Sequence, residues 1–160
     1  MSKKSDSKPR VTEIRNRKAS HDYFIGETFE AGIALTGTEV KSLRQGKAQI
    51  QDAFVRIDRG RPTLYNAHIS EYDFGNIHNH DPKRERRLLL HKAQILKLRG
   101  EVETNGAAIV PLKMYFSKGF VKVLIAVAKG KKLYDKRQDL KKAEAEREAR
   151  SAMSLRKFYK

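Results

Sequence analysis

The residues of this chain that are suited to chemistry are cations placed beside hydrogen-bonding or apolar groups. Asn16 stands between Arg15 and Arg17, and Lys122 interrupts the apolar run 120–128. An amide flanked by guanidinium groups suits RNA, because the amide can bond a base edge while the arginines hold phosphates. Lys122 must reach solvent or an anion. A solvated turn for Asn16 and a lysine lying over apolar neighbours for Lys122 are the alternatives.

A second basic cluster follows the same apolar run, where Lys129, Lys131 and Lys132 stand on either side of Gly130. Such a cluster suits phosphate groups better than base edges. A solvated linker would have the same composition, but the positive charge continues along the chain. The continuing cations are Lys136, Arg137, Lys141 and Lys142. The sequence therefore favours RNA contact along this segment.

The histidines raise the question of a metal site, since His78 and His80 are two residues apart, as on one face of a strand. A metal-dependent nuclease needs further ligands and a catalytic base, and only His68, Asp73 and Asp81 are nearby. We therefore interpret residues 77–81 as a polar loop. The chain has no cysteine, no phosphate-binding glycine loop and no Ser-His-Asp order. We expect no enzyme activity, no metal and no cofactor.

The charge of the chain indicates a polyanionic partner. Its 35 Lys+Arg and 19 Asp+Glu give a formal net charge of +16, and self-repulsion of that size disfavours the free compact state. No apolar run reaches the roughly 18 residues of a membrane span, so a membrane is not the expected partner. The absence of cysteine fits a reducing compartment. We expect a cytoplasmic protein that binds nucleic acid.

Short apolar runs broken by Gly, Asp and Pro predict a mainly β fold. The expected strands are residues 23–25, 29–35, 53–58, 63–69, 109–116 and 120–128. A helix is expected over 38–44 with Thr38 as its N-cap, and a second over 83–98 beginning at Asp81-Pro82. Short antiparallel strands with two or three inserted helices suggest a small OB-like β-barrel.

The composition divides the chain into three parts. Residues 1–12 are basic and polar, which predicts a disordered N-terminus. Residues 13–130 contain the expected RNA-binding barrel. Residues 131–160 form a basic tail, in which Leu140, Met153, Leu155 and Phe158 make no continuous apolar stripe. We expect this tail to be disordered when free and helical when it is bound to RNA.

Several local strings of the sequence carry a family resemblance. They are residues 16–25, 29–33, 37–44, 46–48, 86–90, 127–132 and 135–137. In this order and spacing, over residues 14–140, they resemble the SmpB family. The resemblance implies an OB-like barrel that binds the tRNA-like domain of tmRNA and enters ribosomes stalled on messages without a stop codon. It implies no catalysis, and a tail that follows the empty mRNA channel. A generic single-strand-binding OB protein or a ribosomal protein is the alternative.

The resemblance also assigns residues. Asn16, Glu30, Leu89 and Lys122 match the positions that contribute to tmRNA binding in the family. Glu30 would accept hydrogen bonds from a base edge or orient a basic neighbour. A surface salt bridge is the alternative. At least one leucine of 88–90 should point outward, because three consecutive leucines on a helix cannot all face inward. The complete RNA-binding set is Arg15, Asn16, Arg17, Lys18, His21, Glu30, Lys41, Leu89, Lys122, Lys129, Lys131 and Lys132.

The tail residues expected to contact the ribosome are Tyr134, Asp135, Lys136, Arg137, Lys141 and Lys142. Family members often have His where this chain has Tyr134, and Tyr can stack on a base but cannot carry positive charge. Among the aromatic and histidine side chains at 21, 23, 24, 72 and 74, only His21 is expected to be exposed. The implied partners are tmRNA and the stalled ribosome, and indirectly elongation factor Tu with alanyl-tmRNA. The protein is expected to act as a monomer.

Overall fold

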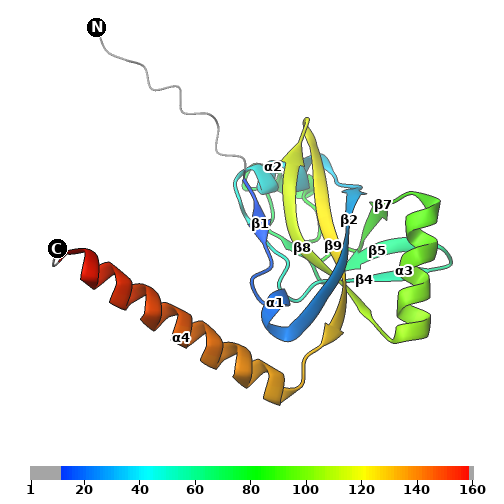
Figure 1. Cartoon of the computed structure of the whole chain (residues 1–160). Helices are drawn as coiled ribbons and strands as arrows, with labels where there is room; N and C mark the ends of the chain where they lie inside the picture. The colour runs from blue at the N-terminus through cyan, green and yellow to red at the C-terminus, as the bar shows by residue number, and fades with distance from the viewer. Residues whose placement is uncertain (1–11, 159–160) are drawn as a thin grey trace, which may run out of the picture.

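The computed structural model describes residues 12–158 and consists of a β body with a long helix that projects from it (Figure 1). The predicted disordered N-terminus, except for Thr12, lies outside the described residues. The strands are β1 Ile14–Arg15, β2 Tyr23–Ile33, β3 Ala48–Gln49, β4 Phe54–Asp58, β5 Arg61–Tyr65, β6 His68–Ile69, β7 Arg86–Leu89, β8 Ala108–Ser117 and β9 Phe120–Gly130. The helices are α1 Ala19–Asp22, α2 Gly37–Arg44, the 3₁₀ turn η1 Asn76–His78, α3 Lys92–Asn105 and α4 Leu133–Phe158.

Seven strands form one antiparallel sheet in the order β1-β8-β4-β5-β7-β2-β9, and β8 also pairs with β9. That last pairing closes β8, β4, β5, β7, β2 and β9 into a ring, which leaves few strand edges exposed. The predicted mainly β antiparallel class is therefore confirmed. Strands β3 and β6 form a separate two-stranded sheet.

The β8–β9 hairpin was predicted closely. Its turn is Lys118-Gly119, with φ of 50° and 81°, and Gly adopts such positive φ without steric cost. Along β9, Val121, Val123 and Ile125 are buried in the main core. Lys122 lies between them on the opposite face, as the period-2 alternation requires.

The expected helix over 83–98 is wrong in its first half. Residues 86–89 form β7, which pairs with β5 and β2, and helix α3 begins only at Lys92. The sequence Arg-Arg-Leu-Leu alternates buried and exposed side chains along β7, and strand partners on both sides outweigh the helical propensity of leucine. The helix also continues through Gly100 and ends at Gly106, whose φ of 61° is the left-handed conformation of a C-cap.

Three smaller differences concern boundaries. The two expected strands at 23–25 and 29–35 are one strand, β2, with an irregularity between Ile25 and Thr28. The β4–β5 turn is only Arg59-Gly60, so Pro62 lies inside β5 opposite Ile57. The N-cap of α2 is Thr36, which forms a capping box with Glu39, and not Thr38.

A buried ion cluster joins α2 to the start of β7 and the residues just before it. The fully buried carboxylate of Glu39 accepts hydrogen bonds from Arg86 Nε at 2.8 Å, Arg84 Nη2 at 2.7 Å and the Thr36 backbone N–H at 2.9 Å. Arg86 is also fully buried and donates to the carbonyls of Ala67, Pro82 and Arg84. These contacts satisfy charges that would otherwise be costly to bury.

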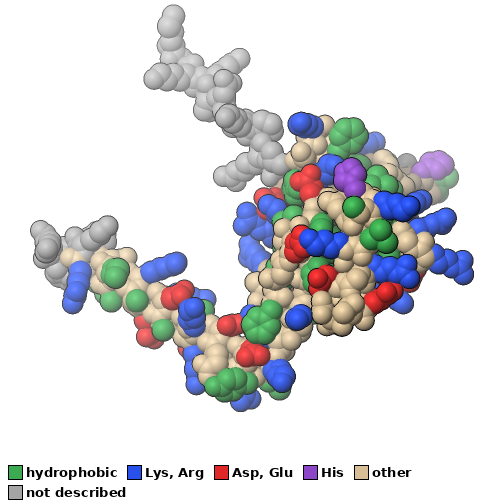
Figure 2. All heavy atoms as spheres, turned by 45° about the vertical axis from the view of Figure 1, so that its right-hand side comes forward, with side chains coloured by type: hydrophobic (Ala, Val, Ile, Leu, Met, Phe, Trp, Pro, Cys, Tyr) green, Lys and Arg blue, Asp and Glu red, His purple; other side chains and the backbone are tan. Residues whose placement is uncertain are grey.

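Helix α4 leaves the body immediately after β9 and is exposed over most of its length (Figures 1 and 2). Its 26 residues include exposed Leu133, Leu140, Met153 and Leu155. The structure thus gives the tail a helical conformation without packing it along the ring. Disorder of the free tail stays a prediction.

Candidate RNA interface

Two residues matched to tmRNA binding lie in one cross-strand row on the outer face of the ring. Leu89 on β7 is opposite Gly32 on β2, Gly32 is opposite Lys122 on β9, and Lys122 is opposite Tyr115 on β8. Opposed residues of antiparallel strands point to the same face. Glu30, two residues before Gly32, therefore also lies on this face. We call the surface made by Glu30, Leu89, Tyr115 and Lys122 the row patch.

Tyr115 holds the carboxylate of Glu30 in place. Its hydroxyl donates a hydrogen bond to Glu30 Oε2. Partial burial, followed by this hydrogen bond and the charge of Glu30, raises the pKa of Tyr115 to about 12, so the phenol stays protonated at neutral pH. The ammonium of Lys113 lies 5.2 Å from the centroid of the Tyr115 ring. Glu30 is thus an acceptor oriented by Tyr115, and within residues 12–158 it is not a member of a salt bridge.

The other two members of the row patch are open to a partner. Leu89 is 58% exposed while its neighbour Leu88 is buried, which confirms that one leucine of 88–90 points outward. Gly32 leaves room for it, because a Cβ there would lie 3.2 Å from the Leu89 Cβ. Within residues 12–158, Lys122 forms no ion pair. Its charge is available to a phosphate.

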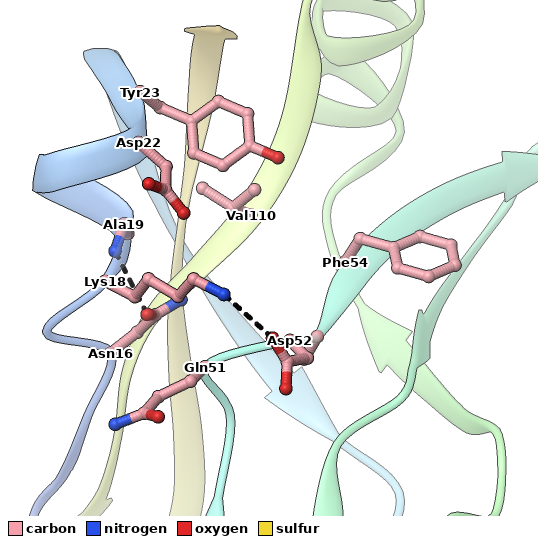
Figure 3. A pocket seen from close by; sticks show the side chains of 10 residues that line it. Asn16, Lys18, Ala19, Asp22, Tyr23, Gln51, Asp52, Phe54 and Val110 are labelled. Atoms are coloured by element: carbon pink, nitrogen blue, oxygen red, sulfur yellow. Dashed lines mark hydrogen bonds and ion pairs between the residues drawn. The ribbon is translucent and has the colours of Figure 1, made fainter. Parts of the chain in front are cut away.

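Asn16 is not the solvated turn residue of the alternative interpretation, because it is only 9% exposed. Its Nδ2 donates to the Pro111 carbonyl at 2.8 Å, and its Oδ1 accepts from the Ala19 backbone N–H at 3.1 Å. Asn16 lines a cleft of about 190 Å³. Figure 3 shows the lining side chains between α1 and the start of β4. Asn16 therefore positions the turn into α1, and through it the exposed side chains of Arg17 and Lys18.

We expect Asn16→Ala to destabilise the fold by about 1–3 kcal/mol, because it leaves a buried carbonyl and a buried N–H without partners. The measurement is chemical denaturation followed by circular dichroism. Gln51→Ala is the matched control, since Gln51 lines the same cleft but is exposed. Equal stability of the Asn16 variant and the wild-type protein would contradict this positioning role.

The remaining cations near the N-terminal end of the body are partly engaged within the protein. Arg15 pairs with Glu13 at 2.9 Å, and Lys18 approaches Asp52 at 3.4 Å across the cleft. Both pairs are mostly exposed, so they contribute little to stability and would exchange readily for phosphate contacts. His21 is exposed, as predicted.

Lys131 is not the free cation that the sequence suggested. Its side chain is 9% exposed, donates to the Ser20 carbonyl at 2.9 Å, and pairs with Asp139 on α4. Lys136 pairs with Asp22 at 3.2 Å. These contacts join the first turns of α4 to α1, while Lys129 and Lys132 remain exposed. Lys131 and Lys136 were expected to contact RNA or the ribosome. In the structure their ion pairs hold the start of α4 against α1.

The other predicted site residues lie away from the row patch. Lys41 is on the exposed face of α2, with its ammonium 5.3 Å from the Tyr72 ring centroid. On α4, Tyr134, Arg137, Lys141 and Lys142 are exposed, whereas Asp135 is half-buried. Sequence reasoning also missed two exposed rings: Phe24 lies in strand β2, two residues before Gly26, and Phe74 lies in a turn next to Gly75.

The histidines of the segment 77–81 do not come together as ligands. His80 is buried and bonds the Thr38 hydroxyl at 2.9 Å and the Ile69 carbonyl at 2.8 Å, whereas His78 is exposed. In the described part of the chain, no three His, Asp or Glu side chains are grouped so as to hold a metal. His80 is thus a packing residue that fixes the loop. No helix among the described residues is long and apolar enough to cross a membrane.

A ring of antiparallel strands, a cationic outer face with an exposed leucine, and a basic helical extension define a small RNA-binding protein of the mainly β class. Residues 13–155 match the family model described as SmpB protein. The chain therefore belongs to the SmpB family.

Two relatives and a solved structure agree with this assignment. The SsrA-binding protein of Shouchella clausii is 58% identical over 142 residues, covering 89% of this chain and 91% of the relative. That of Pelotomaculum thermopropionicum is 56% identical over 146 residues, covering 91% and 94%. The solved structure, described as "tmRNA-SmpB: a journey to the center of the bacterial ribosome", has a TM-score of 0.65 and 50% identity, covering 76% of this chain and 86% of the other.

Proposed function

We propose that this protein binds the tRNA-like domain of tmRNA through the row patch and brings it to stalled ribosomes for trans-translation. The observation that carries the proposal is the convergence of Glu30, Leu89 and Lys122, which come from three separate strands, on one outer face. Relatives named for binding SsrA, and a solved structure named for tmRNA and the ribosome, support it.

The row patch offers three kinds of contact to a folded RNA. Lys122 supplies a cation for phosphate, Leu89 an apolar surface for an unstacked base, and Glu30 an acceptor for a base N–H. A patch of this kind would read the shape of an RNA elbow more than its sequence. The body performs no chemistry in this proposal; it acts as a binding module in the cytoplasm.

The tail would act after tmRNA has bound to the body, when the complex reaches the stalled ribosome. Helix α4 carries exposed Arg137, Lys141 and Lys142, which suit the phosphates of an RNA-lined channel. We infer that it enters the empty mRNA channel, with Tyr134 stacking near the decoding centre in place of the frequent family histidine. The protein would act as a monomer, and elongation factor Tu would participate through alanyl-tmRNA.

We expect Lys122→Ala to weaken binding of the tRNA-like domain about tenfold, because a hydrogen bond to a charged group contributes about 1.5 kcal/mol. The salt dependence of binding should also fall by about one phosphate contact. Gel-shift titrations at several salt concentrations measure both quantities. Arg44→Ala is the control, since it removes one exposed cation of α2 outside the row patch. Unaltered affinity of the Lys122 variant would exclude the row patch as the binding site.

A generic RNA-binding protein remains the second candidate, and the charge of +16 favours it. It predicts that transfer RNA, tmRNA and unstructured RNA of equal length bind equally. Sequencing the RNA that co-purifies from the native cells separates the two. One dominant transcript supports tmRNA, and a broad mixture supports the generic function.

A further inference from the structure

The connection between β6 and β7 differs in charge from the rest of this chain. Residues 62–82 contain no Lys or Arg, although the whole chain has 35. We call residues 71–79 of this stretch the tip loop. Its Asp73 pairs with Lys47 at 2.9 Å, whereas Glu71 forms no ion pair in the described part of the chain. The tip loop therefore has no cation of its own for a phosphate and carries a carboxylate that repels one.

Two large apolar side chains project from the tip loop. Phe74 is 76% exposed and Ile77 is 91% exposed, and Ile77 is the most exposed large apolar side chain among residues 12–158. They stand three residues apart, around the start of the 3₁₀ turn Asn76–His78. Single exposed apolar side chains are common on protein surfaces. These two differ because the backbone that carries them is held in place.

Hydrogen bonds fix the conformation of the tip loop. Asn79 Oδ1 accepts from the Tyr72 backbone N–H at 2.9 Å, and Asn79 Nδ2 donates to the Tyr72 carbonyl at 2.6 Å. Gly75 is packed so closely against this amide that a Cβ there would lie 2.7 Å from Nδ2. Buried His80 bonds the Ile69 carbonyl at 2.8 Å and anchors the end of the loop. A loop that is ordered before binding loses little conformational entropy when it binds.

The base of the tip loop engages two cations that a neighbouring helix and loop supply. The Lys41 ammonium lies 5.3 Å from the Tyr72 ring centroid, and Lys47 is held by Asp73. The Tyr72 ring in turn meets the Phe74 ring edge-on, with centroids 5.5 Å apart. The exposed end of the loop is thus apolar with an acidic neighbour. Such a surface fits a protein partner with cations better than it fits RNA.

We propose that Phe74 and Ile77 dock on a basic protein of the ribosome, in an apolar pocket that is bordered by Lys or Arg. The inference rests on the proposed function in one respect, because tmRNA binding is what brings the chain to the ribosome. Proteins that bind ribosomal RNA are themselves basic, and Glu71 complements that charge. Two side chains bury little area, but the contact becomes intramolecular once tmRNA and the tail hold the protein on the ribosome, which raises its effective concentration.

The first test measures how the complex of full-length protein and tmRNA binds purified ribosomes that are stalled on a message without a stop codon. The Phe74→Ser/Ile77→Ser double variant should bind these ribosomes about tenfold more weakly, as expected for the loss of apolar anchors. Its affinity for tmRNA, measured by gel shift, should stay unchanged. Leu96→Ser is the matched control, because Leu96 is a 59% exposed side chain on α3, and it should change neither affinity.

Charge reversal distinguishes a protein neighbour from an RNA neighbour. Glu71→Lys should weaken ribosome binding about fivefold if the neighbour is basic. Tighter binding of this variant would mean that the neighbour is phosphate, and it would overturn the proposal.

A crosslink identifies the neighbour directly. The variant Phe74→p-benzoylphenylalanine, irradiated in the same purified complex, should give an adduct that resists ribonuclease and contains a basic ribosomal protein, identified by mass spectrometry. An adduct with RNA alone would overturn the proposal.

The remaining outcomes keep this inference separate from the proposed function. The inference fails if the double variant and the wild type bind ribosomes equally, or if the double variant loses tmRNA affinity as well. The proposed function fails instead if the wild-type protein shows no preference for the tRNA-like domain over unstructured RNA.

Discussion

Replacing Glu39 with glutamine should destabilise the protein by about 3–5 kcal/mol, because it leaves the buried Arg86 guanidinium without its counter-charge. Glu39 and Arg86 are both fully buried. The Glu39 carboxylate also accepts hydrogen bonds from the Arg84 guanidinium and the Thr36 backbone N–H. Urea denaturation, with the free energy of unfolding extrapolated to water, measures the change. For a domain whose stability is typically 5–15 kcal/mol, this variant should be near the limit of folding.

The same carboxylate should make stability depend on acid pH. Burial by itself would raise the pKa of Glu39, but the hydrogen bonds from Arg84 and Thr36 and the charge of Arg86 outweigh it and lower the pKa below its ordinary value of 4.5. Because the folded pKa is lower than the unfolded one, Glu39 stabilises the fold above about pH 4.5. That contribution is lost as the pH falls through the folded pKa. Unfolding measured from pH 7 down to pH 3 should show this loss in the wild type and not in Glu39→Gln.

Glu103→Gln is the matched control for both measurements. It removes one carboxylate from an ion pair with Arg99 that is exposed on α3, and pairs of this kind contribute little. A stability loss as large as that of Glu39→Gln would mean that burial of the cluster is not the cause.

Deleting residues 133–160 should abolish peptide tagging on stalled ribosomes while leaving affinity for tmRNA nearly intact. The row patch lies on strands β2, β7, β8 and β9. Among residues 12–158, the ion pairs between the tail and the body, Lys131–Asp139 and Lys136–Asp22, lie near α1. Removing α4 therefore leaves the ring and the row patch complete. A reconstituted translation assay on messages without a stop codon measures tagging, and gel-shift titration measures tmRNA affinity.

A point variant separates loss of the tail from misdirection of the tail. Asp22→Asn weakens the pair with Lys136 but keeps α4 and its cations. We expect intermediate tagging, because the helix is then less firmly oriented at its start. If the truncated protein lost tmRNA affinity to the same degree as tagging, the assignment of tmRNA binding to the body and of ribosome engagement to the tail would be wrong.

The secondary structure was predictable where a local rule decided it. In β9, the alternation from Val121 to Val127 identified both the buried face and the outward Lys122. The helix α2 and the Lys118-Gly119 turn also follow from short-range spacing and from glycine at positive φ. The segment 86–90 was misassigned, because three leucines are compatible with either structure and only pairing with β5 and β2 decides between them.

The candidate site was predictable only in part. The resemblance to the family assigned Glu30, Leu89 and Lys122, but nothing local placed them on one face. Asn16 was expected to contact RNA directly; its side chain is buried and bonds the Pro111 carbonyl, and its contact with RNA stays a prediction. The hydrogen bond from Tyr115 to Glu30 joins residues 85 positions apart, and the Glu39–Arg86 contact joins residues 47 apart. No spacing rule extends over such distances.

Composition and short-range pattern alone determined that the protein is a basic, mainly β molecule with a cationic extension, because charge, alternation and turn chemistry act between neighbours in the chain. The closure of the ring and the register of its strands decided which side chains share a surface, which lysines stay free and which carboxylate is buried. These properties arise from pairing between strands far apart in sequence, where a shift of one residue would turn every outward side chain inward.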